Sequence, residues 1–576
     1  MTATEPALDA HPLTEAPRRS VWSAGFSAHL LALVVLLVGL GALTSAGDSF
    51  GTDDGSYALQ LRALQHGSWV WSSGTERLDP SGEHYPIAFA VPTDRGWVPL
   101  AKHPAWPWLA HLVAPLTGVA HAYAALGLVA IAILASAAWL LAAEHDREWS
   151  RGAFWLAAAA PVVVTFTVGW AHAAAAAAAG LAVLGAVRLV RRGASAATLA
   201  LLAAGIAAGI LLRTEGVLVA AAVAVAIVVG GLKAGRTWWW SGGWAVAVAA
   251  LATGVVRAEA AWVRSITGAG VSTFHVRTDQ NDVAYSFLEA RTQGAIRSLI
   301  DATTAVPRPL LIAVLVGLAV SAGFAAAGRR GAMAAWRIAA TISICLVAAR
   351  VVIRPTYPVT GLLTVWPAAL TGVGAAWALL WRRLSIELTM VVLFAGAIVA
   401  TQYPDGGALQ WGGRFFAPIT VPVAVVAVAG LARLLDAAGE HGSEGRRTAR
   451  LVVVALVVLP LLLGVIGVRS SRSASSTMFS EIDQAVDGVA VTPAGQLPRM
   501  MWNHPERWLV VDADDHGEDL AAVLGSLARG GATDRVSLVL TSTDVPMADD
   551  VLARTAAWHE VDRRHASVLT VVVLSR

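Results

Sequence analysis

The chain has 576 residues, of which 56% are hydrophobic and only 14% are charged, and its formal net charge is +3. Soluble domains carry about 25% charged residues, so this composition favours an integral membrane protein and argues against an ordinary soluble domain. The basic residues form small clusters between apolar runs, a pattern typical of membrane topology and not of a nucleic-acid-binding surface.

Residues 1–21 are polar and end in a proline followed by two arginines, and they predict a cytoplasmic tail. The apolar stretch from Phe26 to Leu43 predicts a first membrane span. It is not a cleaved signal peptide, because it lacks a small-residue cleavage signature and further spans follow it.

A helix that crosses a membrane needs about 20 mostly apolar residues, and this length predicts about thirteen spans. They lie near 26–44, 120–143, 152–169, 172–189, 196–212, 216–232, 239–257, 309–327, 334–353, 359–381, 385–402, 416–435 and 450–468. The fold class that we expect is therefore an α-helical polytopic membrane protein.

The positions of the basic clusters test this topology. Cytoplasmic connections carry an excess of Lys and Arg. Here the clusters follow every even-numbered span: Arg147 and Arg151; Arg188, Arg191 and Arg192; Lys233 and Arg236; Arg329, Arg330 and Arg337; Arg382 and Arg383; Arg433, Arg446, Arg447 and Arg450. The sequence thus predicts a multi-pass plasma-membrane protein with a cytoplasmic N-terminus and an extracytoplasmic C-terminus.

Two predicted outer connections are long, 45–119 and 258–308, so we expect the protein to act on its outer face. They belong to a transmembrane domain over 22–469. Residues 470–576 predict a small extracytoplasmic α/β domain, with strands near 489–492, 508–512, 536–541 and 568–574 and helices near 517–527 and 547–558.

The first outer loop begins with an acidic pair, Asp53 and Asp54, followed by Tyr57, Leu61 and Leu64 at helical spacing. One interpretation is a helix cap followed by an amphipathic helix at the membrane surface. The alternative is a functional pair, because a carboxylate near lipid is costly unless it is hydrated, paired or bound to a cation.

A second segment follows over residues 102–118, KHPAWPWLAHLVAPLTG. Lys102 and His103 precede a proline, and Trp106 and Trp108 begin an aromatic helix. Interfacial tryptophans and lysines are common in membrane proteins, so a purely structural interpretation is open for each of these residues.

Together, the two segments resemble the GT-C glycosyltransferases. The run DDGSYALQLRALQHGSW (53–69) is similar to the first-loop motif of protein O-mannosyltransferases, aminoarabinose transferases and actinobacterial arabinosyltransferases, and the KHP segment to the Lys-x-Pro-aromatic segment that follows it. GRFFAP (413–418) and RTEG (213–216) are weaker matches. His103, Asp54 and Phe415 depart from the residues usual in that group, which leaves the sugar and subfamily open.

The resemblance implies an inverting transferase that moves an arabinose- or mannose-type sugar from a polyprenyl phosphate to a glycan, lipid or protein acceptor on the outer face. It implies that Asp53 is the base and that Asp54 supports it, although the roles could be exchanged. An acceptor hydroxyl benefits from a carboxylate within hydrogen-bond reach, and the leaving phosphate needs cationic donors. The candidate phosphate-binding residues are Lys102, Arg213, Arg354 and Arg414; the candidate substrate-binding residues are Tyr57, His103, Trp106, Glu215 and Tyr357.

Several alternatives stay open at this stage. The outward histidines His66, His103, His172 and His275 show no metal-ligand spacing and are expected at the surface, so no metal ligand is named, although a divalent cation is left open. His275, Arg277 and Asp279 could close over the donor. A transporter or flippase would be expected to carry charges in mid-span, and these spans are almost free of them. A non-catalytic scaffold for envelope assembly is the third class.

Overall fold

The computed structural model describes the chain except for residues 1–23, 45–51, 73, 80, 87–89, 101, 165, 269–285, 302–305, 378–383, 402–410, 502–503, 513–516 and 532. For Ala24, Thr52 and Asp53 it describes the backbone alone. His275, Arg277, Asp279, Arg382 and Arg383 therefore lie outside the described residues.

Nine helices in the described ranges are long and apolar enough to cross a membrane. They are α1 (Ala24–Leu43), α4 (Ala122–Ala143), α7 (His172–Arg192), α9 (Gly216–Lys233), α10 (Trp238–Thr267), α12 (Arg308–Ala326), α13 (Ala332–Ile353), α18 (Thr420–Gly439) and α19 (Ser443–Ala485). The short 3₁₀ helices η2 (Val119–His121) and η5 (Arg414–Ile419) precede α4 and α18. The fold is thus a multi-pass helical one.

The prediction of about thirteen spans is only partly met. Two of the remaining predicted spans are helices of 17 residues, α8 (Ala196–Leu212) and α17 (Ser385–Thr401). The segment near 152–169 divides into α5 (Trp149–Ala158) and α6 (Pro161–Val164), and the segment near 359–381 contains α14 (Leu362–Val365) and α15 (Pro367–Ala376). Both breaks fall ahead of a proline, which disfavours helical backbone in the residue before it.

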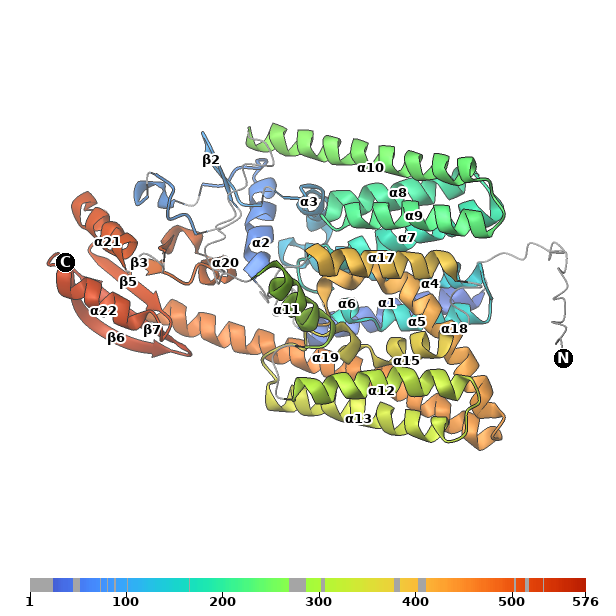
Figure 1. The fold of residues 1–576 in the computed structure, drawn as a ribbon. Coiled ribbons are helices and arrows are strands. Elements are labelled where there is room, and N and C mark those ends of the chain that lie inside the picture. The colour runs from blue at the N-terminus through green and yellow to red at the C-terminus, as the bar shows by residue number, and fades with distance from the viewer. Residues whose placement is uncertain are drawn as a thin grey trace, which may run out of the picture.

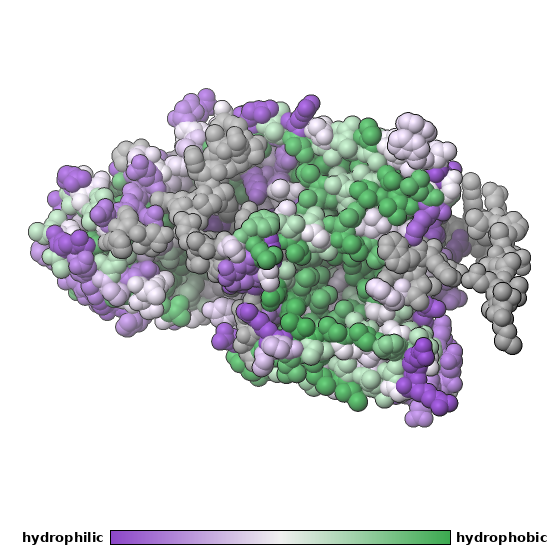
Figure 2. All heavy atoms as spheres, in the orientation of Figure 1, coloured by the Kyte–Doolittle hydropathy of each residue, from purple (hydrophilic) through white to green (hydrophobic). Residues whose placement is uncertain are grey.

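The helices run side by side in one bundle (Figure 1), and on the face that Figure 2 shows, apolar residues cover the middle of the bundle, with polar residues toward both ends. α7 and α18 lie at its centre: of the most apolar 18-residue stretch of each span, 83% of the residues are buried for α7 and 89% for α18. Small residues allow this packing: a Cβ added to Gly430 of α18 would lie 1.9 Å from the carbonyl oxygen of Gly372 in α15.

One end of the bundle carries the shorter elements of the two connections that were predicted to be outer loops, on the same side as the C-terminal sheet (Figure 1). They are α2 (Thr52–Gln65), η1 (Thr75–Arg77), β1 (Val91–Thr93), β2 (Gly96–Val98), α3 (Ala105–Thr117) and α11 (Phe287–Leu299). The α9–α10 and α12–α13 turns, which carry two of the basic clusters, lie at the opposite end. All of the predicted site residues with described side chains come from the first end or from helix ends that face it.

The C-terminal residues form a five-stranded sheet in the order β4-β3-β5-β7-β6. Its elements are β3 (Val489–Thr492), α20 (Leu497–Met500), η6 (Pro505–Arg507), β4 (Trp508–Val510), α21 (Glu518–Gly530), β5 (Arg535–Leu540), α22 (Val545–Arg554), β6 (His559–Ala566) and β7 (Leu569–Ser575). The four predicted strands and two predicted helices are present. β6 was not predicted, because it is an exposed edge strand rich in charged residues.

The sheet and the bundle are joined in two ways. α19 continues from the bundle to the sheet as one helix of 43 residues (Figure 1). The first outer loop also pairs with the edge strand β4, since the backbone N–H of Val510 donates to the carbonyl of His84 at 3.0 Å. α20 packs against α2. The C-terminal unit therefore lies directly over the helix that carries the acidic pair.

Candidate functional site

The acidic pair lies in the first turn of α2 and not ahead of it, because the helix begins at Thr52. Asp54 is partly buried, and the side chain of Asp53 lies outside the described residues. Tyr57, Leu61 and Leu64 are buried as their spacing predicts, with exposed fractions of 6%, 0% and 7%. Leu59 on another face is also fully buried. The interpretation of α2 as an amphipathic helix at the lipid surface is therefore wrong: α3 and α20 cover it.

Aromatic packing fixes α2 against the loop that leads into α7. The ring of Tyr57 lies 5.6 Å from that of Tyr123, and the Tyr123 hydroxyl donates to the carbonyl of Tyr57 at 2.9 Å. Trp106 of α3 is buried, and its indole N–H donates to the carbonyl of Gly169 at 2.7 Å. A Cβ added to Gly169 would touch both tyrosines. The first turn of α2 is thereby held beside residues 166–171.

Lys102 and His103 precede α3, but their side chains differ in burial. Lys102 is exposed and His103 is buried, so the expectation of a surface histidine is wrong for His103. His103 has a φ of 53°, in the left-handed region that histidine tolerates better than most residues. Its Nδ1 lies 2.8 Å from the Glu259 carboxylate of α10, and its Nε2 lies 3.0 Å from the hydroxyl of Thr214. This one side chain joins three segments of the chain.

Burial lowers the pKa of His103, and the charges of Arg213 and Lys102 act in the same direction, while Glu259 opposes them. The neutral imidazole is therefore favoured at neutral pH. The electrostatic effect of both cations on His103 also shows that Lys102 and the turn between α8 and α9 are close together.

That turn carries a buried ion pair. Arg213 donates two hydrogen bonds to Glu215, at 3.1 and 2.8 Å. Burial acts to raise the pKa of Glu215, but the charge and hydrogen bonds of Arg213 lower it to about 2. Gly216 follows and begins α9; a Cβ there would lie 2.3 Å from the backbone of Gly209, so only glycine lets the turn close. The RTEG motif thus holds a guanidinium between the ends of α8 and α9.

Arg414 lies at the start of η5, after two glycines with positive φ, Gly412 and Gly413. Its guanidinium lies 5.4 Å from the ring centroid of Trp170 and 4.8 Å from that of Phe415. Cation–π contacts of this kind orient a guanidinium while keeping its charge. Arg414 thus lies beside the same 166–171 loop that contacts α2 and α3.

The predicted residues therefore divide into two groups. Lys102, His103, Arg213 and Glu215 form one cluster, and Arg414 joins it, since Arg213 and Arg414 act electrostatically on a shared neighbour, His172. Among the described residues, no hydrogen bond or ion pair links Arg354 or Tyr357 to this cluster. Arg354 ends α13 with an exposed side chain, and Tyr357 is 48% exposed.

Three residues that our sequence reasoning passed over contribute to this region. Glu259 contacts His103; it lies in the predicted outer connection 258–308, whereas in the structure α10 extends through it. Arg472 of α19 is buried and donates to the carbonyls of Thr44 and Thr167, which ties α19 to the ends of α1 and of the 166–171 loop. His172 is buried, so the expectation of a surface residue is also wrong for it. Glu259 stands close to the apolar run of the preceding span, which is the signal that could have identified it, whereas Arg472 lies in a serine-rich stretch that carries no such signal.

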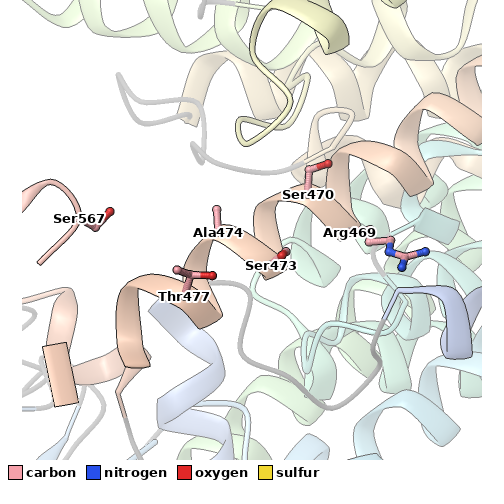
Figure 3. A pocket seen from close by; sticks show the side chains of 6 residues that line it. All are labelled: Arg469, Ser470, Ser473, Ala474, Thr477 and Ser567. Carbon is pink, nitrogen blue, oxygen red and sulfur yellow. The ribbon is translucent and has the colours of Figure 1, made fainter. Parts of the chain in front are cut away.

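A separate open cleft of about 530 Å³ lies between α19 and the turn that joins β6 to β7 (Figure 3). Four of its six lining residues carry hydroxyl groups; the lining consists of Arg469, Ser470, Ser473, Ala474, Thr477 and Ser567. Hydroxyl groups and one guanidinium suit a polar, polyhydroxylated ligand better than an apolar one.

Among the described residues, no group of three or more His, Cys, Asp and Glu side chains gathers closely enough to hold a metal ion. The side chain of Asp53 lies outside the described residues.

The helical bundle and its C-terminal sheet define the class: a polytopic membrane protein whose fold is similar to those of two solved proteins, ArnT and an archaeal oligosaccharyltransferase. ArnT from Cupriavidus metallidurans in the apo state is 13% identical, with a TM-score of 0.52 over 95% of this chain and 98% of that chain. The apo oligosaccharyltransferase from Archaeoglobus fulgidus is 13% identical, with a TM-score of 0.51 over 90% of this chain and 70% of its own. The structure of the same enzyme in complex with Zn and sulfate is 12% identical, with a TM-score of 0.52 over 88% of this chain and 67% of that chain.

At 12 to 13% identity, these similarities show the fold alone. No protein-family model matches the chain, and no curated protein matches it in sequence. The predicted resemblance to GT-C proteins is confirmed at the level of the fold, and the chemistry rests on the residues themselves.

Proposed function

We propose that this protein is a GT-C glycosyltransferase that moves a sugar from a polyprenyl-phosphate donor to a cell-envelope acceptor. The observation that carries the proposal is the cluster of Lys102, Arg213 and Arg414, which come from three different connections at one end of the bundle. Arg414 contacts Trp170 of the 166–171 loop, and Gly169 of that loop packs against Tyr57 of the acidic helix α2. The GT-C fold of the chain supports it.

In this proposal the cations hold the donor phosphate. A lipid phosphate that leaves the anomeric carbon carries its charge away, so it needs cationic donors and no protonating acid. Arg213 and Arg414 are held rigidly by Glu215 and by two aromatic rings, which reduces the reorganisation needed when the donor binds. Lys102 is exposed and can reach the phosphate from the loop side.

Asp53 or Asp54 takes the proton of the acceptor hydroxyl. A carboxylate in the first turn of a helix stays ionised more readily because the helix dipole favours negative charge there. The side chain of Asp54 is partly buried and α20 packs against α2, so the acceptor would approach between the bundle and the C-terminal sheet. We assign acceptor binding to residues 470–576, and the hydroxyl-lined cleft beside α19 is the surface that suits it.

The finer parts of the proposal follow from the sequence resemblance: an inverting reaction, an arabinose- or mannose-type sugar, and a plasma-membrane orientation with the N-terminus inside and the C-terminus outside. Tyr57 and Trp106 would shape the pocket through their contacts with Gly169. Arg354 and Tyr357 follow the end of α13 and are exposed, so they would bind substrate only after a movement toward the cluster.

The experiment is transfer by the purified full chain in detergent, with polyprenyl-phosphate arabinose and polyprenyl-phosphate mannose as donors and cell-envelope glycan as acceptor. Asp53→Asn, Asp54→Asn and Lys102→Ala should each reduce transfer by at least about a hundredfold for a base or a phosphate ligand. Asp94→Asn is the matched control, because Asp94 lies in the same loop with an exposed side chain.

Two results would contradict the proposal. If both Asp variants keep the wild-type rate, neither acid is the base. If a deletion strain accumulates lipid-linked sugars on the inner leaflet and the purified protein transfers nothing, the transporter alternative is favoured instead. Intact envelope glycans in that strain would favour the scaffold.

A further inference from the structure

His172 is a buried histidine whose ring has nothing to bond to in the described part of the chain. It is the first residue of α7 and is 5% exposed, and neither Nδ1 nor Nε2 has a hydrogen-bond partner among the described residues. Buried polar groups are nearly always hydrogen-bonded, so an imidazole with two unmet nitrogens needs a reason.

Two other histidines with buried side chains show the ordinary arrangement. His103 contacts Glu259 and Thr214 through its two nitrogens. His145, at the other end of the bundle, contacts Glu387 at 2.6 Å and Arg191 at 2.7 Å. The chain therefore supplies partners for buried imidazoles elsewhere, and His172 is an exception to its own pattern.

The groups around His172 favour a negatively charged ligand as its hydrogen-bond partner. The two charged groups that act on its ring are both cations, Arg213 and Arg414. Its ring lies 5.9 Å from that of Trp170 and 6.5 Å from that of Phe415, measured between centroids. These are the same two rings that hold the Arg414 guanidinium. The ring of His172 thus has two aromatic neighbours, Trp170 and Phe415, and two cationic neighbours, Arg213 and Arg414.

The backbone adds to this positive character. His172 begins a helix of 21 residues, and the first N–H groups of a helix have no acceptor within it, so its N-terminus attracts anions. The partner that suits an N–H of imidazole, two guanidinium groups and a helix N-terminus is an anion with several acceptor oxygens, which describes a phosphate.

We propose that His172 donates a hydrogen bond to the phosphate of the lipid-linked donor, and so acts as a catalytic residue; this inference rests on the proposed function. During transfer, the bond between the anomeric carbon and the phosphate oxygen breaks and its electron pair stays on that oxygen. The acceptor oxygen bonds the anomeric carbon, and its proton passes to the Asp53 or Asp54 carboxylate. His172 keeps its own proton and stabilises the charge that collects on the phosphate.

The test uses the full chain in detergent and farnesyl phosphate as the probe, with farnesol as the uncharged control ligand. His172→Gln keeps an N–H donor on a flexible side chain, and His172→Met has a similar length without one. We expect His172→Gln to bind farnesyl phosphate within about threefold of the wild type and His172→Met to bind at least about tenfold more weakly, which is the scale of a hydrogen bond to a charged group. His121→Phe, an exposed histidine near the outer helix ends, should bind normally.

The outcomes separate this inference from the proposed function. If the wild type binds farnesyl phosphate no better than farnesol, the proposed donor class is wrong. If the wild type binds it and Lys102→Ala weakens binding, but His172→Met binds as tightly as His172→Gln, the role of His172 is refuted and the donor proposal stands. Should His172→Met not fold, His172→Phe, which keeps an aromatic ring without an N–H group, takes its place in the same comparison.

Discussion

The Arg213–Glu215 pair allows a quantitative prediction. Their side chains are 17% and 12% exposed, so removing the guanidinium in Arg213→Met leaves a largely buried carboxylate without its cation. The pKa of Glu215 lies at about 2 against an ordinary value of 4.5, a difference that corresponds to roughly 3 kcal/mol. Breaking a buried pair costs a similar amount, about 3–5 kcal/mol. After some relief by solvent, we expect Arg213→Met to lower the free energy of unfolding by about 2–3 kcal/mol at pH 7.

The pH dependence gives the sign of the effect. In the wild type, the stabilisation of ionised Glu215 is present above pH 4.5 and is lost as the pH falls toward 2. In Arg213→Met, the guanidinium that lowers the pKa of Glu215 is absent and burial still raises it, so the pKa of Glu215 rises. The variant should therefore regain stability as the pH falls from 8 to 5, while this pair contributes no such change to the wild type.

The measurement is unfolding in mixed micelles of dodecyl maltoside and SDS between pH 5 and 8. The double variant Arg213→Met/Glu215→Gln should recover most of the loss, because no buried charge remains. Arg535→Met is the matched control: it removes a guanidinium from an ion pair that is 58% and 48% exposed, and should change stability by less than about 1 kcal/mol. Equal stability of Arg213→Met and the wild type, or no recovery in the double variant, would refute the reasoning.

Three further predictions concern other contacts. Burial lowers the pKa of His103, so the wild type should lose stability as the pH falls from about 7 to 5, and His103→Gln should flatten that slope in the same unfolding assay. Gly430→Ala should destabilise the bundle by at least about 2 kcal/mol, because its Cβ would lie 1.9 Å from a backbone oxygen, whereas Gly396→Ala, with nothing within 4 Å, should be neutral or slightly stabilising in thermal unfolding. Arg472→Met should loosen the ends of α1 and the 166–171 loop; faster amide exchange there, and unchanged exchange in β5, would support this contact, and uniform exchange would contradict it.

Much of the architecture could be predicted from the amino-acid sequence. Long apolar runs indicate nine of the predicted spans, because hydrophobic length is a local property of the chain. The count of about thirteen is met only in part among the described residues, and prolines divide two of the predicted runs, before Pro161 and Pro367. The alternation and turn signals of residues 489–574 predicted four of the five strands, and β6 was passed over because an exposed edge strand has no apolar face.

The candidate site shows the limit of local patterns. The acidic pair, Lys102, Arg213 and Arg414 could be selected from short motifs, but these motifs are spread over more than three hundred residues of sequence. Whether they meet depends on how the helices pack. The structure places Lys102 and Arg213 around His103, places Arg213 and Arg414 around His172, and leaves Arg354 exposed after α13.

By itself, the sequence determined that this chain is a multi-pass membrane protein with an acidic first-loop helix and a small C-terminal α/β unit, because each of these depends on hydrophobic length, periodicity or neighbouring residues. Only the tertiary structure decided that His103 and His172 are buried, that one is fully partnered and the other has no partner among the described residues, and that two arginines act on the second. Burial and partnership arise from contacts between distant segments, and no local pattern carries that information.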